Sequence, residues 1–254
     1  MVPKLALVTG ASSGIGEALA QRIAADGVDL ILVARREDRL RALAAELPVE
    51  THVVPLDLTD RGAPEALMAE VARYGRPVDV LVNNAGFGHA GAFAKEPLEQ
   101  QLGMVDLNIR ALVELSHRVL PALVERRHGG ILNVASTAAF LPGPYVSVYY
   151  ATKAFVLSLS EALAEECRGK GVTISALCPG PTTSEFGAVS GMDRTRLFKT
   201  IQRMTSAEVA DAGWKGFRAG RRVVVPGWQN KMSSVVTRHG PRALLLPMVK
   251  FLQS

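Results

Sequence analysis

The feature that most constrains this chain is a glycine-rich turn near its start. The letters TGASSGIG run from Thr9 to Gly16, directly after an apolar run that begins at Leu5 and before helix-forming letters that continue to Ala25. Gly27 follows, where a left-handed helix end is usual. Strand, glycine turn and helix in this order open a βαβ unit. The start of the chain therefore predicts an open α/β sheet.

The glycines of this turn are spaced to approach a phosphate. They follow the pattern G-x-x-x-G-x-G, so the backbone can pass close to a pyrophosphate, whose charge then meets free amides and the positive end of a helix. The turn predicts a dinucleotide cofactor, and the alternative is a tight turn that binds nothing. The expected contacts come from Gly10, Ser12, Ser13, Gly14, Ile15 and Gly16.

Two arginines follow the second apolar run, about where an acidic residue would bind the ribose of NAD. This chain has Arg35 and Arg36 there. Guanidinium groups favour the 2′-phosphate of NADP(H), because they donate paired, charge-assisted hydrogen bonds to it. The alternative is that both are solvated residues at a helix start. We expect NADP(H) as the cofactor.

Short apolar runs recur between longer amphipathic stretches along the rest of the chain. Such near-continuous apolar strands suit a parallel sheet that is covered on both faces. A long helical stretch runs from Pro97 to Arg126, and Thr205 and Glu208 have capping-box spacing before another helix. Strands are expected at 5–9, 29–33, 52–56, 79–82, 131–135, 172–177 and 222–225.

Length and composition fit this pattern. The 254 residues are 48% hydrophobic, and no linker or repeat divides them. We expect one domain over 1–254, an α/β fold with a Rossmann-type doubly wound parallel sheet of about seven strands and helices on both faces.

Composition also limits the setting and the partners. No run approaches the roughly 20 apolar residues of a spanning helix. Cys167 and Cys178 lack metal-ligand spacing, so we expect no metal, and although a disulfide between them is conceivable, a reducing cytoplasm is the simplest setting. The net charge of +5 is concentrated from Arg221 onward, where six Lys or Arg occur without Asp or Glu. Without a nucleic-acid motif, this basic tail is a weak reason to expect a nucleic-acid partner.

Several strings in this chain resemble the short-chain dehydrogenase/reductase family, and the resemblance covers nearly the whole chain. The strings that carry it are TGASSGIG, NNAG at Asn83 to Gly86, YYATK at Tyr149 to Lys153, and PG at Pro179 and Gly180, with Asn108 and Ser136 in the expected order. Cys178 precedes the Pro-Gly pair where asparagine is common, a change that we expect to be harmless.

The resemblance implies a role for each matching residue. The catalytic group would be Asn108, Ser136, Tyr149 and Lys153, with Ser136 polarising a substrate carbonyl, Lys153 binding the nicotinamide ribose and Asn108 supporting a water-linked proton path. Further cofactor contacts would come from Asp57, Leu58, Asn84, Ala85, Gly86, Tyr149, Lys153, Pro179, Gly180 and Thr182. Taken singly, each of these residues could instead be structural.

The chemistry of carbonyl reduction explains why Tyr149 suits the role of proton donor. Carbonyl reduction needs a proton for the developing alkoxide, and a tyrosine of ordinary pKa about 10 delivers it more readily when a nearby ammonium lowers that pKa. Lys153 lies one helical turn beyond Tyr149, on the same face. Tyr150 points about a hundred degrees away, from the helical period, and is interpreted as packing.

The resemblance also places the substrate wall, in three segments with mostly apolar side chains. Such a wall suits a hydrophobic ketone, aldehyde or secondary alcohol, although the same side chains could be core. His89, in a Gly/Ala-rich loop, is interpreted as a surface histidine. The expected wall residues are Ser136, Phe87, Phe140, Leu141, Val146 and Phe186.

The remaining expectations concern partners and rival functions. A homo-oligomer, dimer or tetramer, is implied by resemblance. The basic, apolar segment at about 231–254 predicts either weak membrane-surface contact or packing against the fold or a second subunit. Rival functions are a 3-oxoacyl thioester reductase, a non-catalytic NADP(H) sensor or scaffold, and, last, a nucleic-acid binder.

Overall fold

The strands of the main sheet are apolar at nearly every position, because helices cover both faces. The computed structural model describes residues 3–196 and 203–253. All strand pairs are parallel, in the order β3-β2-β1-β4-β5-β6-β9. The seven strands are β1 (Leu5–Thr9), β2 (Asp29–Ala34), β3 (Thr51–Pro55), β4 (Val80–Asn83), β5 (Gly130–Val134), β6 (Thr173–Leu177) and β9 (Val223–Val224).

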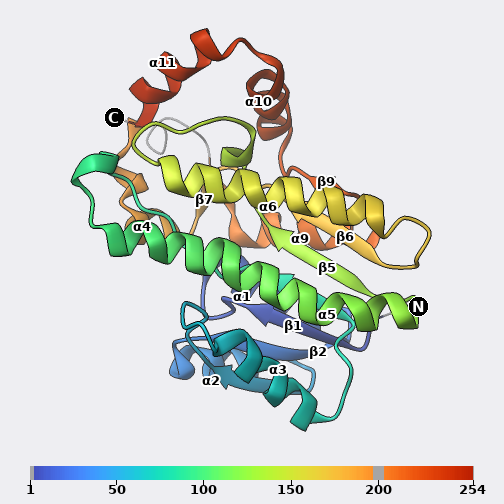
Figure 1. The fold of residues 1–254 in the computed structure, drawn as a ribbon. Coiled ribbons are helices and arrows are strands. Elements are labelled where there is room, and N and C mark those ends of the chain that lie inside the picture. The colour runs from blue at the N-terminus through green and yellow to red at the C-terminus, as the bar shows by residue number, and fades with distance from the viewer. Residues whose placement is uncertain (1–2, 197–202, 254) are drawn as a thin grey trace.

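Six helices form the two covering layers (Figure 1). One layer packs with Ala6 and Val8 of β1, and the other packs with Leu5 and Leu7 of the same strand. The first layer is α1 (Gly14–Ala24), α2 (Glu37–Glu46) and α9 (Ser206–Arg218). The second is α3 (Ala63–Tyr74), α5 (Leu112–Arg126) and α6 (Ser147–Glu166). The alternation along β1 explains why its five residues are all buried.

The smaller elements lie at the carboxyl ends of the strands and around them. Two short strands pair with each other outside the main sheet. These elements are α4 (Leu98–Val105), a π-helical segment (Asp106–Ala111), the 3₁₀ turns Phe93–Lys95, Thr137–Phe140 and Met192–Arg194, β7 (Thr182–Thr183), α7 (Glu185–Ser190) and β8 (Met204–Thr205). Two further helices, α10 (Trp228–His239) and α11 (Arg242–Gln253), project beyond the layers at one end of the molecule (Figure 1).

The predicted fold class is confirmed, and the differences in detail have local causes. The first strand has the predicted bounds, β2 is one residue longer than predicted, and the other five are shifted or shortened by one or two residues. The predicted helix at 97–126 starts at Leu98 and is interrupted by the π-helical segment. Gly27 has φ +75°, and Thr205 and Glu208 form the capping box at the start of α9. The sequence pattern therefore predicted the existence of the helices and strands more accurately than it predicted where each begins and ends.

Gly16 is required where α1 crosses the end of the sheet. A Cβ atom at this position would collide with the backbone oxygen of Gly10 and with the side chain of Asn84. The glycine therefore permits the close contact between helix and strands that fixes the turn.

Replacing Gly16 by alanine should lower the free energy of unfolding by about 3 kcal/mol, because buried backbone must shift to admit the new carbon. Denaturant unfolding measures this change. Gly62→Ala is the matched control, since it adds the same carbon where nothing lies within 4 Å, and it should change stability by less than about 1 kcal/mol. Equal effects of the two substitutions would contradict the steric explanation.

Candidate active site

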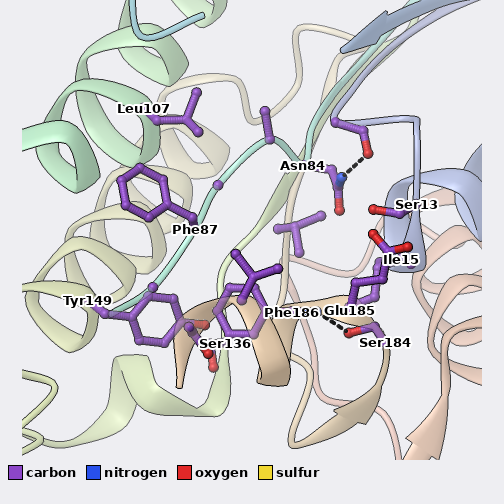
Figure 2. Close-up of a pocket in the computed structure, with 18 of the residues that line it drawn as sticks. Ser13, Ile15, Asn84, Phe87, Leu107, Ser136, Tyr149, Ser184, Glu185 and Phe186 are labelled. Atoms are coloured by element: carbon purple, nitrogen blue, oxygen red, sulfur yellow. Dashed lines mark hydrogen bonds between the residues drawn. The ribbon is translucent and has the colours of Figure 1, made fainter. Parts of the chain in front are cut away.

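A cavity of about 430 Å³ opens at the carboxyl ends of the central strands, where the strand order reverses between β1 and β4. Ligands of open α/β sheets bind at this switch point. Figure 2 shows its two ends: Ser13, Ile15, Asn84 and Glu185 gather at one, and the rings of Tyr149, Phe87 and Phe186 at the other. The cavity therefore joins the glycine turn to the aromatic cluster.

The turn between β1 and α1 presents its backbone to the cavity. Gly10 and Gly14 have φ values of +66° and +59°, which side chains with a Cβ rarely adopt. Ser12, Ser13 and Ile15 also line the cavity at the start of α1. Ser13 is the N-cap residue and its side chain makes no capping bond, so backbone amides at this helix start can meet an anion.

Gly16 is the one of the six expected contact residues in the turn that does not line the cavity. It lies beneath the turn, packed on Gly10 and Asn84. Gly16 shapes the turn from below, and its contact with the cofactor stays a prediction.

The two arginines after β2 line the same end of the cavity. The Arg36 guanidinium donates to the Ser12 hydroxyl at 3.3 Å and pairs with Glu185 at 2.9 Å. The Arg35 side chain is 75% exposed, and its guanidinium lies 3.5 Å from the Asp57 carboxylate. Both cations therefore lie at the same end of the cavity as the glycine turn.

Asp57 and Leu58 form a further part of this wall. Burial alone would raise the pKa of Asp57, but hydrogen bonds from the Thr59 amide and hydroxyl, together with Arg35, hold it below its usual value. The carboxylate is thus fixed in its charged form beside the cavity.

Asn84 ties the end of β4 to the end of β1. Its side-chain amide donates to the backbone oxygens of Thr9 and Gly10, at 3.0 and 3.1 Å. In return, the Thr9 hydroxyl accepts from the amides of Asn84 and Ala85. Ala85 and Gly86 are thereby held along the cavity wall. Pro179, Gly180 and Thr182 also line the cavity.

Tyr149 and Ser136 meet at the other end of the cavity (Figure 2). Ser136 is the N-cap of the turn after β5, and its hydroxyl accepts from the Ala138 amide. Burial raises the pKa of Tyr149, while a hydrogen bond with Ser136 opposes that rise. The phenol therefore keeps its proton throughout the neutral range, as a proton donor must before it acts.

Lys153 follows Tyr149 by one turn of α6. Its ammonium donates to the Val134 oxygen at 2.8 Å and lies 5.8 Å from the centre of the Tyr149 ring. Burial lowers the pKa of Lys153 from 10.5 to about 8, which Cys178 partly opposes. The expected lowering of the Tyr149 pKa is therefore corrected for this structure, because burial outweighs the neighbouring groups.

Asn108 lies in the π-helical segment and is almost completely buried. Its amide donates to the Phe87 oxygen at 2.9 Å and to the Thr152 hydroxyl at 3.0 Å, and its oxygen accepts from the Phe87 amide. Asn108 does not line the cavity. It fixes the backbone after β4, and its part in a water-linked path stays a prediction.

Some of the predicted substrate-wall residues line the cavity and others do not. Phe87 and Phe186 line the cavity, and the Phe186 ring lies 5.5 Å from the Tyr149 ring. Phe140, Leu141 and Val146 do not line it, because they pack into apolar clusters beside α6. Membership of the three expected segments could not separate these two groups.

Other cavity residues escaped the sequence-based expectation. Val189, Ser190 and Met192 line the cavity from α7 and the turn after it, and Gln253 reaches it from α11. The apolar spacing of α11 predicted a helix but not where it would dock. Gln253 donates to the Tyr150 hydroxyl at 2.6 Å, so Tyr150, interpreted as packing, is buried at the cavity wall with a polar partner.

Known proteins can be compared with this geometry. A sequence model of the short chain dehydrogenases matches residues 4–194, most of the chain. The chain belongs to the short-chain dehydrogenase/reductase family.

Named members of this family align with most of the chain. Serine 3-dehydrogenase of Rhizobium radiobacter is 39% identical over 81% of this chain and 84% of its own. NADP-dependent 3-hydroxy acid dehydrogenase YdfG of Salmonella typhi is 36% identical over 83% and 87%. A short-chain dehydrogenase from Sphingobium yanoikuyae, solved in complex with NADPH, is 34% identical, with a TM-score of 0.84 over 95% of both chains.

One smaller expectation is corrected in this family member. His89 is not a solvated surface residue, because it is half-buried and pairs with Glu96 at 2.5 Å. Cys167 and Cys178 are free buried thiols and do not form a disulfide. Among the described residues, no cluster of potential metal ligands and no helix able to cross a membrane is found.

Lys153 should reduce the stability of the ligand-free dehydrogenase at neutral pH. The fall in its pKa from 10.5 to about 8 corresponds to about 3 kcal/mol, and loss of the bond to Val134 offsets about 1 kcal/mol. Lys153→Met should therefore raise the free energy of unfolding at pH 7 by about 2 kcal/mol. Denaturant unfolding without cofactor measures it, with exposed Lys170→Met as control.

The pH dependence of stability shows whether the Lys153 ammonium stabilises or destabilises the fold. Below pH 8 both states of the wild type carry the Lys153 proton, so the destabilisation is complete. Between pH 8 and 10.5 only the unfolded state keeps it, and wild-type stability rises toward that of Lys153→Met. A variant less stable than wild type at every pH would show that the ammonium stabilises the fold.

Proposed function

We propose that this protein transfers hydride reversibly between NADP(H) and a hydrophobic ketone, aldehyde or secondary alcohol, with Tyr149 as general acid and base. The observation that carries the proposal is the position of the Tyr149 and Ser136 hydroxyls at the apolar end of a cavity whose other end holds two arginines. The family relationship and the NADP-dependent relatives support it.

The residues present fit NADP(H) along the whole cavity. The α1 start meets the pyrophosphate, Arg35 and Arg36 meet the 2′-phosphate, Asp57 and Leu58 border the adenosine, and Pro179, Gly180 and Thr182 border the nicotinamide. Gly86 allows close approach, since a Cβ there would lie 2.9 Å from the Asn108 oxygen and 3.5 Å from the Lys153 ammonium.

The protein's own groups perform the acid–base part of the reaction. When bound, the reduced nicotinamide supplies the hydride. Ser136 donates to the substrate oxygen and orients the carbonyl beside Tyr149. Tyr149 gives its proton to the same oxygen as negative charge develops, and Lys153, held by Val134, binds the nicotinamide ribose and stabilises the phenolate. In the reverse direction, Tyr149 accepts the alcohol proton.

The cavity wall favours an uncharged substrate. Phe87, Phe186, Val189 and Met192 are the large apolar side chains at the Tyr149 end. Lys153 is the one cation that lines this end within the described parts of the chain, and it is directed to Val134. Serine and 3-hydroxy acids, for which two relatives are named, carry a carboxylate, whereas this wall suits a hydrophobic carbonyl compound.

We also propose that the enzyme works in the cytoplasm as a homo-oligomer. Its two free thiols fit a reducing compartment. Leu98, Leu102 and Val105 form an exposed apolar stripe along α4, with exposures of 63, 51 and 38%. A second subunit would cover that stripe.

Tyr149→Phe should lower NADPH-dependent turnover by at least about 100-fold and leave NADPH binding intact, because only the proton donor is lost. Spectrophotometric assays with hydrophobic ketones, aldehydes and 3-oxoacyl thioesters test this and narrow the substrate. Tyr150→Phe is the matched control and should retain most activity. Substantial turnover by Tyr149→Phe would remove Tyr149 from the mechanism, and NADPH binding without turnover of any compound would favour a cofactor sensor.

Arg36→Ala should raise the dissociation constant for NADPH about tenfold or more and change that for NADH little, because charge-assisted bonds to the 2′-phosphate are lost. Fluorescence titration measures both constants. Arg41→Ala removes the same charge from an exposed site where the guanidinium pairs with Glu37 in the same helix, so it serves as control. Equal weakening for both cofactors would exclude a specific phosphate contact.

A further inference from the structure

Helix α10 carries an apolar stripe that no part of the described chain covers. None of its twelve residues is buried. Trp228, Met232, Val235 and Val236 are 73, 60, 57 and 55% exposed, and their spacing of four, seven and eight residues places them on one helix face. Large side chains gathered in this way on an exposed face mark an interaction surface.

Helix α11 is divided lengthwise into a packed face and an exposed face. Leu245, Val249 and Gln253 are buried against the body of the protein. Leu244 and Met248 are 72 and 48% exposed, four residues apart on another side. The helix is thus anchored by one stripe and presents a second stripe outward.

The charges on these two helices have one sign. Residues 228–253 contain four Lys or Arg and no Asp or Glu. Lys231 and Lys250 are exposed, Arg238 lies 3.8 Å from Glu161, and Arg242 donates to the Phe140 oxygen. The outward surface of α10 and α11, which we call the tail surface, therefore combines exposed apolar side chains with positive charge.

We propose that the tail surface binds an anionic lipid bilayer. Two amphipathic helices with large apolar side chains and lysines match the interface between headgroups and acyl chains, where cations meet lipid phosphates. Each helix has twelve residues and is too short to span a bilayer, so both lie along its surface.

Charge distinguishes the bilayer from a second copy of this chain. A symmetric dimer through the tail surface would place its four cations against the same four of the partner, without a carboxylate from either pair of helices. An anionic bilayer instead supplies the missing negative charge and an apolar layer together. This inference does not depend on the proposed reaction.

Co-sedimentation of the full chain with vesicles tests the proposal. The protein should bind vesicles of phosphatidylcholine mixed with phosphatidylglycerol, bind phosphatidylcholine alone much more weakly, and lose binding as salt increases. Lys231→Glu combined with Lys250→Glu should weaken binding at least about tenfold. Arg61→Glu combined with Lys170→Glu makes the same change in net charge on exposed residues elsewhere and should leave binding unchanged.

An apolar variant separates the lipid from a protein partner. Met232→Glu combined with Leu244→Glu should also weaken vesicle binding, while thermal unfolding shows that the fold is kept, since both side chains are exposed. Equal binding by wild type and both tail variants, or no binding by wild type, would overturn the proposal. So would an unaltered vesicle interaction with a changed oligomeric state by sedimentation velocity, which would make this face a subunit contact.

Discussion

The hydrogen bonds between the ends of β1 and β4 hold the position on which the site depends. Four bonds cross this point: the Asn84 side chain donates to the backbone oxygens of Thr9 and Gly10, and the Thr9 hydroxyl accepts from the backbone amides of Asn84 and Ala85. They fix the glycine turn on one side and the Ala85–Gly86 backbone on the other. Because the strand order reverses here, these residues border one cavity. The acid–base group and the phosphate-binding end lie on elements that extend in different directions from this point.

Much of this arrangement is predictable from the sequence because short-range patterns specify it. The strand letters, Gly10 and Gly14, and the four-residue spacing of Tyr149 and Lys153 depend on local backbone geometry and helical period. Gly16 lies beneath the turn and not at the cavity surface, because the side on which this glycine is approached depends on Asn84, far along the chain. Local pattern identifies the residue type required, and tertiary packing decides what it contacts.

The rest of the site depends on long-range contacts that no periodicity encodes. Phe87 and Phe186 reach the cavity while Phe140 and Val146, equally apolar, are buried beside α6. Gln253 reaches Tyr150 across 103 residues of sequence. The pKa of Tyr149 could not be predicted either, because the balance between burial and neighbouring groups is a property of the folded site.

The Arg36–Glu185 ion pair connects the two ends of the cavity. Glu185 is the first residue of α7, the helix that carries Phe186 over the Tyr149 end. If Arg36 binds the 2′-phosphate as proposed, the phosphate competes with Glu185 for the same guanidinium. By linkage, any change in α7 that follows must alter the affinity for the phosphate and the affinity for the substrate by the same factor. The proposed phosphate contact of Arg36 would in this way couple cofactor affinity to substrate affinity, across a separation of 149 residues in sequence.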